Sequence, residues 1–307
     1  MKYKYNFSFI IPHKNVPDLL VRCVNSIPQR DDIEVIIVDD NSKSDIVDNF
    51  PIKDSQNVRV IFTKEGLGAG HARNVGLNNS SGKWIIFADS DDFFTDGINT
   101  VIEKVLNSEY ELYVFESCSV LSDTLKPTHK RVDGIEGYKK TYDESILRYC
   151  TPNVWGKVFS RDLIVSKGMP FDEEIAANDV KVSVKCGINA KNVLFLPYIS
   201  YCCTVRGGSI STKHDLAHTD ARFKVHLQVI EVFKEANVPS RYMLNLLGPV
   251  FDYLHISKSK FIKALFLYVK NVPFQRRFLD AKESGSRFIQ RIFHLNKDQE
   301  MRDIYNY

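Results

Sequence analysis

Residues 84–94 read WIIFADSDDFF, an apolar run that ends abruptly in a cluster of carboxylates. A short apolar run of this kind is typical of a buried parallel strand that is covered on both faces. In open α/β sheets, ligands bind at the carboxyl ends of such strands. The carboxylates of Asp89, Asp91 and Asp92 repel one another, and a hard divalent cation with oxygen ligands would relieve that repulsion. The stretch therefore predicts a strand whose tip is either a solvated acidic turn or a metal site.

A second buried strand with an acidic tip lies earlier in the chain, where EVIIV at 34–38 is followed by Asp39 and Asp40. Between the two tips, the glycine-rich residues 66–76, GLGAGHARNVG, let the backbone approach a ligand closely and open a helix near residue 69. Further strands alternate with helices, which predicts a doubly wound α/β fold with a parallel sheet. The carboxyl ends of parallel strands share one edge. Two acidic tips with Arg73 between them therefore indicate a nucleotide site that includes a metal.

The totals exclude several classes of protein. The chain has 307 residues, 44% of them hydrophobic and 26% charged, which are ordinary globular values. A net charge of +3 is too small to argue for nucleic acid as a partner. The six cysteines show no CxxC spacing, so neither a zinc site nor a disulfide scaffold is expected. The first apolar run is too short for a signal peptide, and no stretch approaches the ~20 apolar residues of a membrane span. We therefore expect a cytoplasmic protein, or one attached peripherally to the inner face of the membrane.

The last part of the chain differs in pattern and in charge. From about Asp220 the pattern is helical to the end, and residues 241–307 hold 12 Lys/Arg against 6 Asp/Glu. Apolar residues recur there at helical spacing, for example Phe261, Leu265, Phe266 and Val269. Two interpretations follow from this pattern. The helices pack on the preceding domain with a solvated basic face, or they form a basic amphipathic surface that lies on an anionic membrane.

Short motifs in a fixed order make the chain resemble the inverting family 2 glycosyltransferases with a GT-A fold. They are FSFIIPHKN at 7–15, VDDNS at 38–42, ARNVG at 72–76, ADSDD at 88–92 and VWGK at 154–157. The resemblance covers about the first two-thirds of the chain. It implies a GT-A domain at 1–215, a Rossmann-like nucleotide-diphospho-sugar transferase domain with a mostly parallel central sheet, followed by a C-terminal helical region at 216–307. Within the domain, 1–95 would be the nucleotide-sugar half and 96–215 the acceptor half.

The resemblance also implies an activity. It is the metal-dependent, inverting transfer of a hexose from a nucleotide-diphospho-sugar, most simply a UDP-sugar, to an acceptor hydroxyl. The cofactor would be Mn²⁺ or Mg²⁺ bound at the DXD motif Asp89–Asp91. The acceptor would be a glycan or a lipid-linked glycan in surface polysaccharide synthesis, and peripheral membrane contact would come from the C-terminal helices.

The family's functional residues can be placed on this sequence one by one. The residues expected to bind the donor are Pro12, His13, Asn15, Asp40, Arg73 and Asp89. Asp89 and Asp91 would bind the metal, and Asp179 would be the catalytic base. Lys157, Asn178 and His214 are further candidates, the last as a ligand that completes the metal shell. The chain departs from the family's pattern at Lys14, where an aromatic residue usually stacks on the base, and at Asn178, where a glutamate usually precedes the base.

The position of Asp179 at the start of a helix carries an electrostatic expectation. A carboxylate at a helix N-terminus has its charged form stabilised by the helix dipole. This predicts an ionised Asp179 that is ready to accept a proton but is a weaker base.

Three other functions fit parts of the pattern. GLGAGH at 66–71 is close to the GxGxxG fingerprint of a dinucleotide-dependent oxidoreductase, and Asp89 lies about 20 residues further on. A phosphohydrolase could use an aspartate of the DxD as its nucleophile. A catalytically inactive nucleotide-sugar-binding protein is favoured by Asn178. Release of nucleotide from a panel of nucleotide-sugars would separate these functions from a glycosyltransferase.

Overall fold

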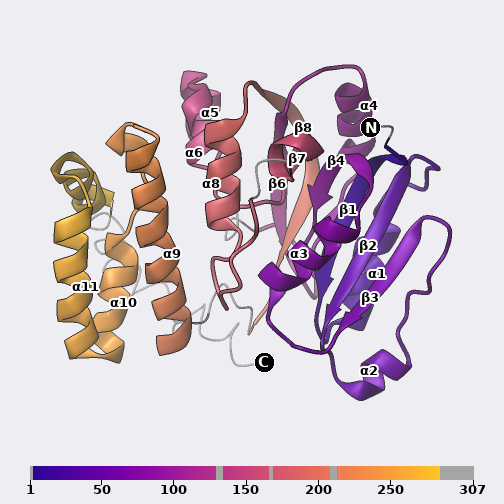
Figure 1. The fold of residues 1–307 in the computed structure, drawn as a ribbon, viewed down its shortest axis with the longest axis horizontal. Helices are drawn as coiled ribbons and strands as arrows, with labels where there is room; N and C mark the ends of the chain where they lie inside the picture. Colours follow the sequence, from indigo (N-terminus) through magenta and orange to yellow (C-terminus); the bar gives the residue numbers. More distant parts are fainter. Residues whose placement is uncertain (1–2, 129–133, 166–168, 208–212, 214, 284–307) are drawn as a thin grey trace. The chain divides into compact units, whose positions relative to one another are not determined.

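The computed structural model describes residues 3–128, 134–165, 169–207, 213 and 215–283. Its elements are β1 Tyr5–His13, α1 Pro17–Asn25, β2 Ile33–Asp40, α2 Ser44–Asp48, β3 Val58–Thr63, α3 Ala69–Asn79, β4 Gly82–Phe87, β5 Phe93–Phe94, α4 Gly97–Leu106, β6 Leu112–Leu121, α5 Glu136–Thr141, α6 Glu144–Tyr149, β7 Lys157–Ser160, α7 Arg161–Ile164, α8 Val180–Asn189, β8 Val193–Val205, α9 Leu216–Glu235, η2 Ser240–Tyr242, α10 Leu247–Ile256 and α11 Lys258–Asn271 (Figure 1). The chain separates into two compact units, Met1–Arg206 and Gly207–Tyr307.

An eight-stranded sheet in the order β3-β2-β1-β4-β7-β6-β8-β5 forms the centre of the first unit (Figure 1). β1 pairs in parallel with β2 and with β4, and β2 pairs in parallel with β3. β7 runs antiparallel between β4 and β6, and β8 runs parallel to β6. The α/β fold with a mostly parallel central sheet is thereby confirmed.

The two faces of the sheet are both covered, as the apolar runs of its strands predict. Phe7, Phe9 and Ile11 of β1 are buried in one core together with residues of α1 and α4. Ile10, which points to the opposite face, is buried in a second core with residues of α6, α7 and α8. Successive side chains of a strand point to opposite faces, so a strand with two buried faces has few polar positions.

β1 and β2 extend further than their apolar runs indicate. They end at His13 and Asp40, and the parallel ladder between them pairs Pro12 with Val38 and His13 with Asp39. The polar residues that follow the apolar runs are therefore the last residues of these two strands. Their side-chain directions are fixed by the sheet, and all of them lie at its carboxyl edge.

The second unit consists of α9, α10 and α11, with further helical backbone at 274–283. Its core includes Val229 and Phe233 of α9, Tyr253 of α10 and Tyr268 of α11, all buried. The Tyr253 hydroxyl donates to Asp220 at 2.7 Å, and Tyr268 donates to the buried Asp280 at 3.1 Å. The predicted C-terminal helical region is confirmed. None of the helices in the described part of the chain is long and apolar enough to span a membrane.

Candidate active site

The ARNVG motif lies in α3, and its small residues seat this helix on the sheet. Ala72 is buried against Ile36 and Val38 of β2. A Cβ atom on Gly76 would lie 2.4 Å from Cγ2 of Ile10, so a larger residue there would push the helix off β1. A Cβ atom on Gly70 would likewise lie 1.9 Å from the backbone oxygen of Asp172. Glycine and alanine at these positions let α3 lie close to the strands on one side and to residues 171–178 on the other.

The polar residues of the same motif join the acidic strand tip to residues 171–178. The Arg73 guanidinium is buried and donates to Oδ1 of Asp89 at 2.6 Å and to Oδ1 of Asn178 at 2.7 Å. The Asn74 side-chain amide donates to the Phe171 carbonyl at 3.0 Å and accepts the Phe171 N–H at 2.8 Å. Charge-assisted bonds of this length are among the stronger hydrogen bonds in proteins. One turn of α3 therefore fixes the distance between the acidic turn and residues 171–178.

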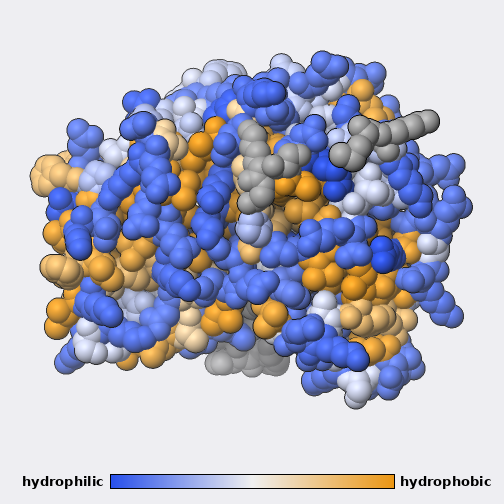
Figure 2. All heavy atoms as spheres, viewed as in Figure 1, coloured by the Kyte–Doolittle hydropathy of each residue, from blue (hydrophilic) through white to orange (hydrophobic). Residues whose placement is uncertain are grey.

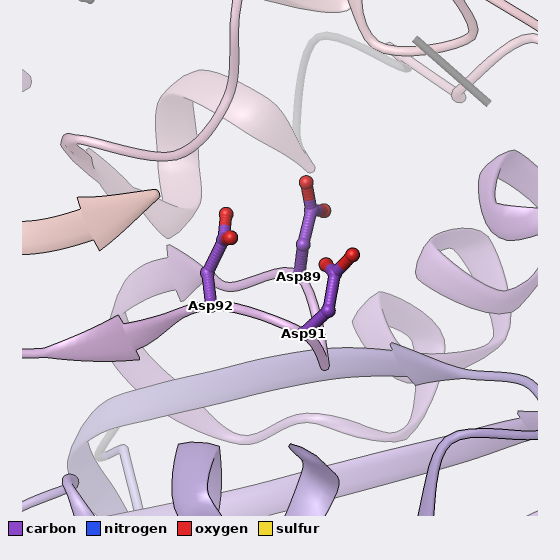
Figure 3. Close-up of side chains that lie close together, drawn as sticks. All are labelled: Asp89, Asp91 and Asp92. Atoms are coloured by element: carbon purple, nitrogen blue, oxygen red, sulfur yellow. The ribbon is translucent and has the colours of Figure 1, made fainter. Parts of the chain in front are cut away.

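The three carboxylates after β4 have different surroundings (Figure 3). Asp92 is fully buried, and it accepts the Tyr201 hydroxyl at 3.0 Å and the Thr204 N–H at 2.6 Å. The side chains of Asp89 and Asp91 keep 26% and 17% exposure, and in Figure 3 all three side chains extend to the same side of the turn. Asp92 thus shapes the turn and ties it to β8, whereas Asp89 and Asp91 open to solvent.

The donor set of this cluster fits a hard divalent cation. Carboxylate oxygens of Asp89, Asp91 and Asp92 lie within 4.8 Å of one another. Mg²⁺ and Mn²⁺ prefer oxygen ligands, and a protein commonly supplies one or two carboxylates while water or phosphate fills the other positions. Asp89 and Asp91, the two predicted ligands, are the partly exposed pair. Their role as metal ligands stays a prediction.

An arginine side chain that the sequence analysis did not single out forms an ion pair with this cluster. Nε of Arg206 donates to Oδ2 of Asp91 at 3.1 Å. Arg206 follows β8 and is 115 residues from Asp91 in the chain. The β6–β8 pairing brings the end of β8 to the acidic turn, and no local pattern in the sequence gives that pairing.

The two aspartates that end β2 make different contacts. Asp39 is buried and accepts hydrogen bonds from the Ser42 N–H at 2.8 Å and the Ser42 hydroxyl at 2.6 Å, as well as from His13 at 2.7 Å. Burial acts to raise the pKa of Asp39, but these hydrogen bonds outweigh it and hold the pKa below its usual value. Asp39 therefore stays ionised and fixes the turn.

Asp40 lies on the face of the sheet that α3 covers. Its carboxylate accepts the Gly68 N–H at 3.0 Å and the Lys14 ammonium at 3.0 Å. Gly68 adopts a φ of 94°, which glycine tolerates and which lets its N–H point at Asp40 just before α3 begins. Lys14 thus occupies space beside the carboxylate that is predicted to bind the nucleoside.

His13 and Asn15 hold the turns at the sheet edge together. His13 is 1% exposed, and its Nε2 accepts the Val16 N–H at 3.2 Å, so the proton is on Nδ1, which donates to Asp39. The Asn15 side-chain oxygen accepts the Lys43 N–H at 2.9 Å. Pro12 is paired with Val38 within β1. These residues lie at the predicted place, and their contact with a donor stays a prediction.

Asp179 is the N-cap residue of α8 and is partly buried. Burial raises its pKa, while the charge of Arg73 and a hydrogen bond from the Val154 backbone offset part of this rise. The direction is opposite to the one expected from the helix dipole, because desolvation at this position is the larger effect. The charges of Arg73 and Asp89 both act on Asp179, so its carboxylate lies near these two side chains.

Of the remaining candidates, Lys157 and Asn178 form hydrogen bonds with other residues of the first unit. Lys157 is 1% exposed and donates to the Thr151 carbonyl and, at 2.6 Å, to the Ser183 hydroxyl of α8. Burial lowers the pKa of Lys157 to about 7. Asn178 accepts from Arg73, as given above, and thereby positions that side chain. His214 lies outside the described residues.

The chain is similar to bacterial glycosyltransferases. It is 26% identical over 220 residues to "Glycosyltransferase GlyA" of Streptococcus pneumoniae serotype 4, covering 66% of this chain and 31% of that protein. It is 27% identical over 183 residues to a GalNAc(5)-diNAcBac-PP-undecaprenol beta-1,3-glucosyltransferase of Campylobacter jejuni, covering 58% of each. It thus spans less than two thirds of the length of either relative. The crystal structure of S. aureus TarS 1-349 in complex with UDP-GlcNAc superposes with a TM-score of 0.68 and 19% identity, covering 87% of this chain and 82% of that one.

The structural likeness to TarS shows a GT-A fold. Residues 8–160 match the model of Glycosyl transferase family 2, and the chain belongs to this family. The resemblance seen in the sequence is thereby confirmed. The interpretations as a dinucleotide-dependent oxidoreductase and as a phosphohydrolase are set aside by the family assignment.

Proposed function

We propose that this protein transfers a sugar from a nucleotide-diphospho-sugar, a UDP-sugar, to a hydroxyl of a glycan or lipid-linked glycan in bacterial surface polysaccharide synthesis, with inversion and with Mn²⁺ or Mg²⁺. One observation carries the proposal. Arg73 contacts Asp89 and Asn178 directly, so the acidic tip and the base candidate Asp179 converge around it. The UDP-GlcNAc complex of TarS supports the donor, and the name of the Campylobacter relative supports a lipid-linked acceptor.

Donor binding would use the carboxyl edge of the sheet. Asp40 can accept a hydrogen bond from a base edge once Lys14 moves aside. Arg73 offers a further donor, since its Nε is buried and has no hydrogen-bond partner among the described residues. Asp89 and Asp91 would hold the divalent cation, which when bound supplies Lewis-acid stabilisation of the departing diphosphate, worth several kcal/mol.

Asp179 would take the proton from the acceptor hydroxyl. A general base is most effective when its pKa lies near the operating pH, so the raised pKa of Asp179 favours this role. Attack from the face opposite the diphosphate inverts the anomeric centre. The base must then lie across the donor from the acidic tip, and we assign this place to Asp179, the N-cap residue of α8.

The test of this function is turnover with a defined stereochemical outcome. The protein is incubated with MnCl₂, an acceptor and a panel of UDP-, GDP- and dTDP-sugars, and nucleotide release and the anomeric configuration of the product are measured. Acceptor-dependent release with inversion supports the proposal. A product with retained configuration refutes the mechanism, and UDP binding without any release supports the inactive nucleotide-sugar-binding protein. Asp179→Asn is the matched control for background hydrolysis.

Peripheral membrane contact belongs to the same proposal. Ile262, Phe266, Phe274 and Phe278 of the second unit are 66–75% exposed, and Figure 2 shows hydrophobic side chains gathered over α10 and α11. Lysines such as Lys263 lie on α11, the helix that also carries Ile262 and Phe266, and would attract anionic lipid. The protein is expected to sediment with phosphatidylglycerol vesicles at low salt and to be released as the salt concentration rises. Phe266→Ser and Phe278→Ser should weaken this binding, and equal binding to neutral vesicles would argue against it.

A further inference from the structure

The guanidinium of Arg206 has no role in the proposed function, and it forms an ion pair with the predicted metal ligand Asp91. Arg206 is 38% exposed and donates from Nε to Oδ2 of Asp91, whose side chain is 17% exposed. The end of β8 fixes it there, because the Thr204 N–H binds Asp92 and the Thr204 hydroxyl donates to the Asp91 carbonyl at 2.7 Å. The Arg22 guanidinium donates to the same carbonyl at 2.7 Å. The backbone of the acidic turn is thus held independently of the Arg206–Asp91 ion pair.

A divalent cation and this guanidinium compete for the same carboxylate. A Mg²⁺ ion lies about 2.1 Å from a ligand oxygen. With Nε at 3.1 Å from that oxygen, the two cations would be at most about 5 Å apart. Like charges at this distance repel. A metal ion bound at Asp91 therefore favours the release of Arg206 from this carboxylate.

We infer that Arg206 is the internal counter-ion of the metal site, which lowers the affinity of the donor-free protein for a divalent cation and couples metal binding to nucleotide binding. This inference rests on the proposed function. In the donor-free protein, metal binding breaks the Arg206–Asp91 ion pair and leaves the arginine without an anion. When a nucleoside diphosphate is present, its phosphates supply a new anion for the released guanidinium. Each ligand then raises the affinity of the other by the same factor, as linkage requires.

The magnitude follows from the exposure of the pair. Partly exposed ion pairs contribute modestly, so their loss changes an equilibrium by roughly two- to fivefold. In Arg206→Ala and Arg206→Gln, Mn²⁺ without nucleotide should bind roughly two- to fivefold more tightly than in the wild type. UDP should then raise Mn²⁺ affinity less than it does in the wild type. Arg206→Lys, which keeps a charge at this place, should stay near the wild-type values.

The experiment is a titration of MnCl₂ followed by the electron paramagnetic resonance signal of free Mn²⁺, with and without saturating UDP. Arg59→Ala is the matched control, since Arg59 is an exposed arginine on the edge strand β3. It changes the net charge equally without touching the acidic turn. A gain in metal affinity is a readout that damage to the fold would not produce. Circular dichroism confirms that each variant is folded.

Tighter Mn²⁺ binding in both neutral Arg206 variants, with reduced coupling to UDP and no change in Arg59→Ala, supports the inference. Unchanged or weaker Mn²⁺ binding in those variants overturns it, provided that Asp91→Ala abolishes binding. If neither the wild type nor any variant binds Mn²⁺ with or without UDP, the metal proposal itself fails and this inference with it. The Asp91→Ala titration tells the two failures apart.

Discussion

Replacing Asp179 by asparagine tests the proposed catalytic base, which is distant in the sequence from the acidic strand tips. The substitution keeps the size and shape of the side chain and replaces one carboxylate oxygen by an NH₂ group, which cannot accept a proton from the acceptor. General-base catalysis contributes roughly 10²–10⁴-fold, which corresponds to about 2.7–5.4 kcal/mol of activation free energy. We expect turnover to fall by this factor. Donor affinity should change little, because the proton is transferred only in the transition state. In addition, Asp40 and Arg73 form hydrogen bonds with Gly68, Asp89 and Asn178, and these bonds do not involve Asp179.

The same substitution should stabilise the protein at neutral pH. Burial raises the folded-state pKa of Asp179 above its unfolded value. The folded state therefore binds this proton more tightly, and the stability that it provides is fully present below the unfolded pKa. That stability is lost as the pH rises through the folded pKa. Above the folded pKa the ionised Asp179 costs stability, and asparagine resembles its neutral form. A higher Tm with a lower turnover would identify a functional residue rather than a structural one.

The assay compares initial rates and UDP affinity across pH. The wild type should lose activity on the acid side at a pH above the usual range of an aspartate, since the base must be ionised. The controls are Asp172→Asn, Glu173→Gln and Glu174→Gln, which neutralise nearby carboxylates. Asp172 is paired with Lys181 and Glu173 with His71, so we expect small effects from them. Near-normal transfer by Asp179→Asn, with loss of transfer in one of the controls, would refute the assignment of the base.

Three further predictions concern the rest of the site. Asp91→Ala should abolish metal-dependent UDP binding while leaving the Tm within a few degrees, because the side chain is partly exposed and leaves no core cavity; full activity in excess chelator would contradict this. Asp40→Ala should raise the donor KM more than it lowers kcat, since a base contact exists in both the ground and transition states, and unchanged UDP affinity by calorimetry would exclude that contact. Asn74→Ala removes both hydrogen bonds to Phe171 and should cost about 1–3 kcal/mol, seen as a Tm lowered by roughly 2–4 °C per kcal/mol, with a lower turnover; an unchanged Tm would show that residues 171–178 are held in another way.

Strands β1 to β4 could be predicted from the sequence because most of them are short apolar runs with a polar tip. The buried run at 84–88 follows from this pattern, whereas β2 continues past its apolar run through Asp39 and Asp40. The start of α3 at Ala69 was also predictable, since glycine punctuation precedes it. The strand order beyond β4 was not predictable, because β7, β6 and β8 pair across large separations in the chain. That part of the sheet brings Tyr201, Thr204 and Arg206 to the acidic turn.

The sequence predicted which residues lie together at the site better than it predicted their pKa values and burial. The sequence places Asp179 at a helix N-terminus, and the helix is found there. The direction of its pKa depends on burial by residues from distant segments, and no spacing rule provides that burial. Asp92 likewise appears equivalent to Asp89 and Asp91 in the sequence. Only the contacts with Tyr201 and Thr204 distinguish the carboxylate that holds the turn from those that face solvent.

The seating of α3 has a consequence for engineering the specificity of this enzyme family member. Ala72, Arg73, Asn74 and Gly76 each contact a different segment, namely β2, the acidic turn, residue 171 and β1. A rotation or shift of this helix would move its contacts with the acidic turn and with residue 171 together. Libraries that aim to change the sugar or the acceptor separately should therefore randomise exposed loop positions such as Leu67 and Ile175 and leave α3 unchanged.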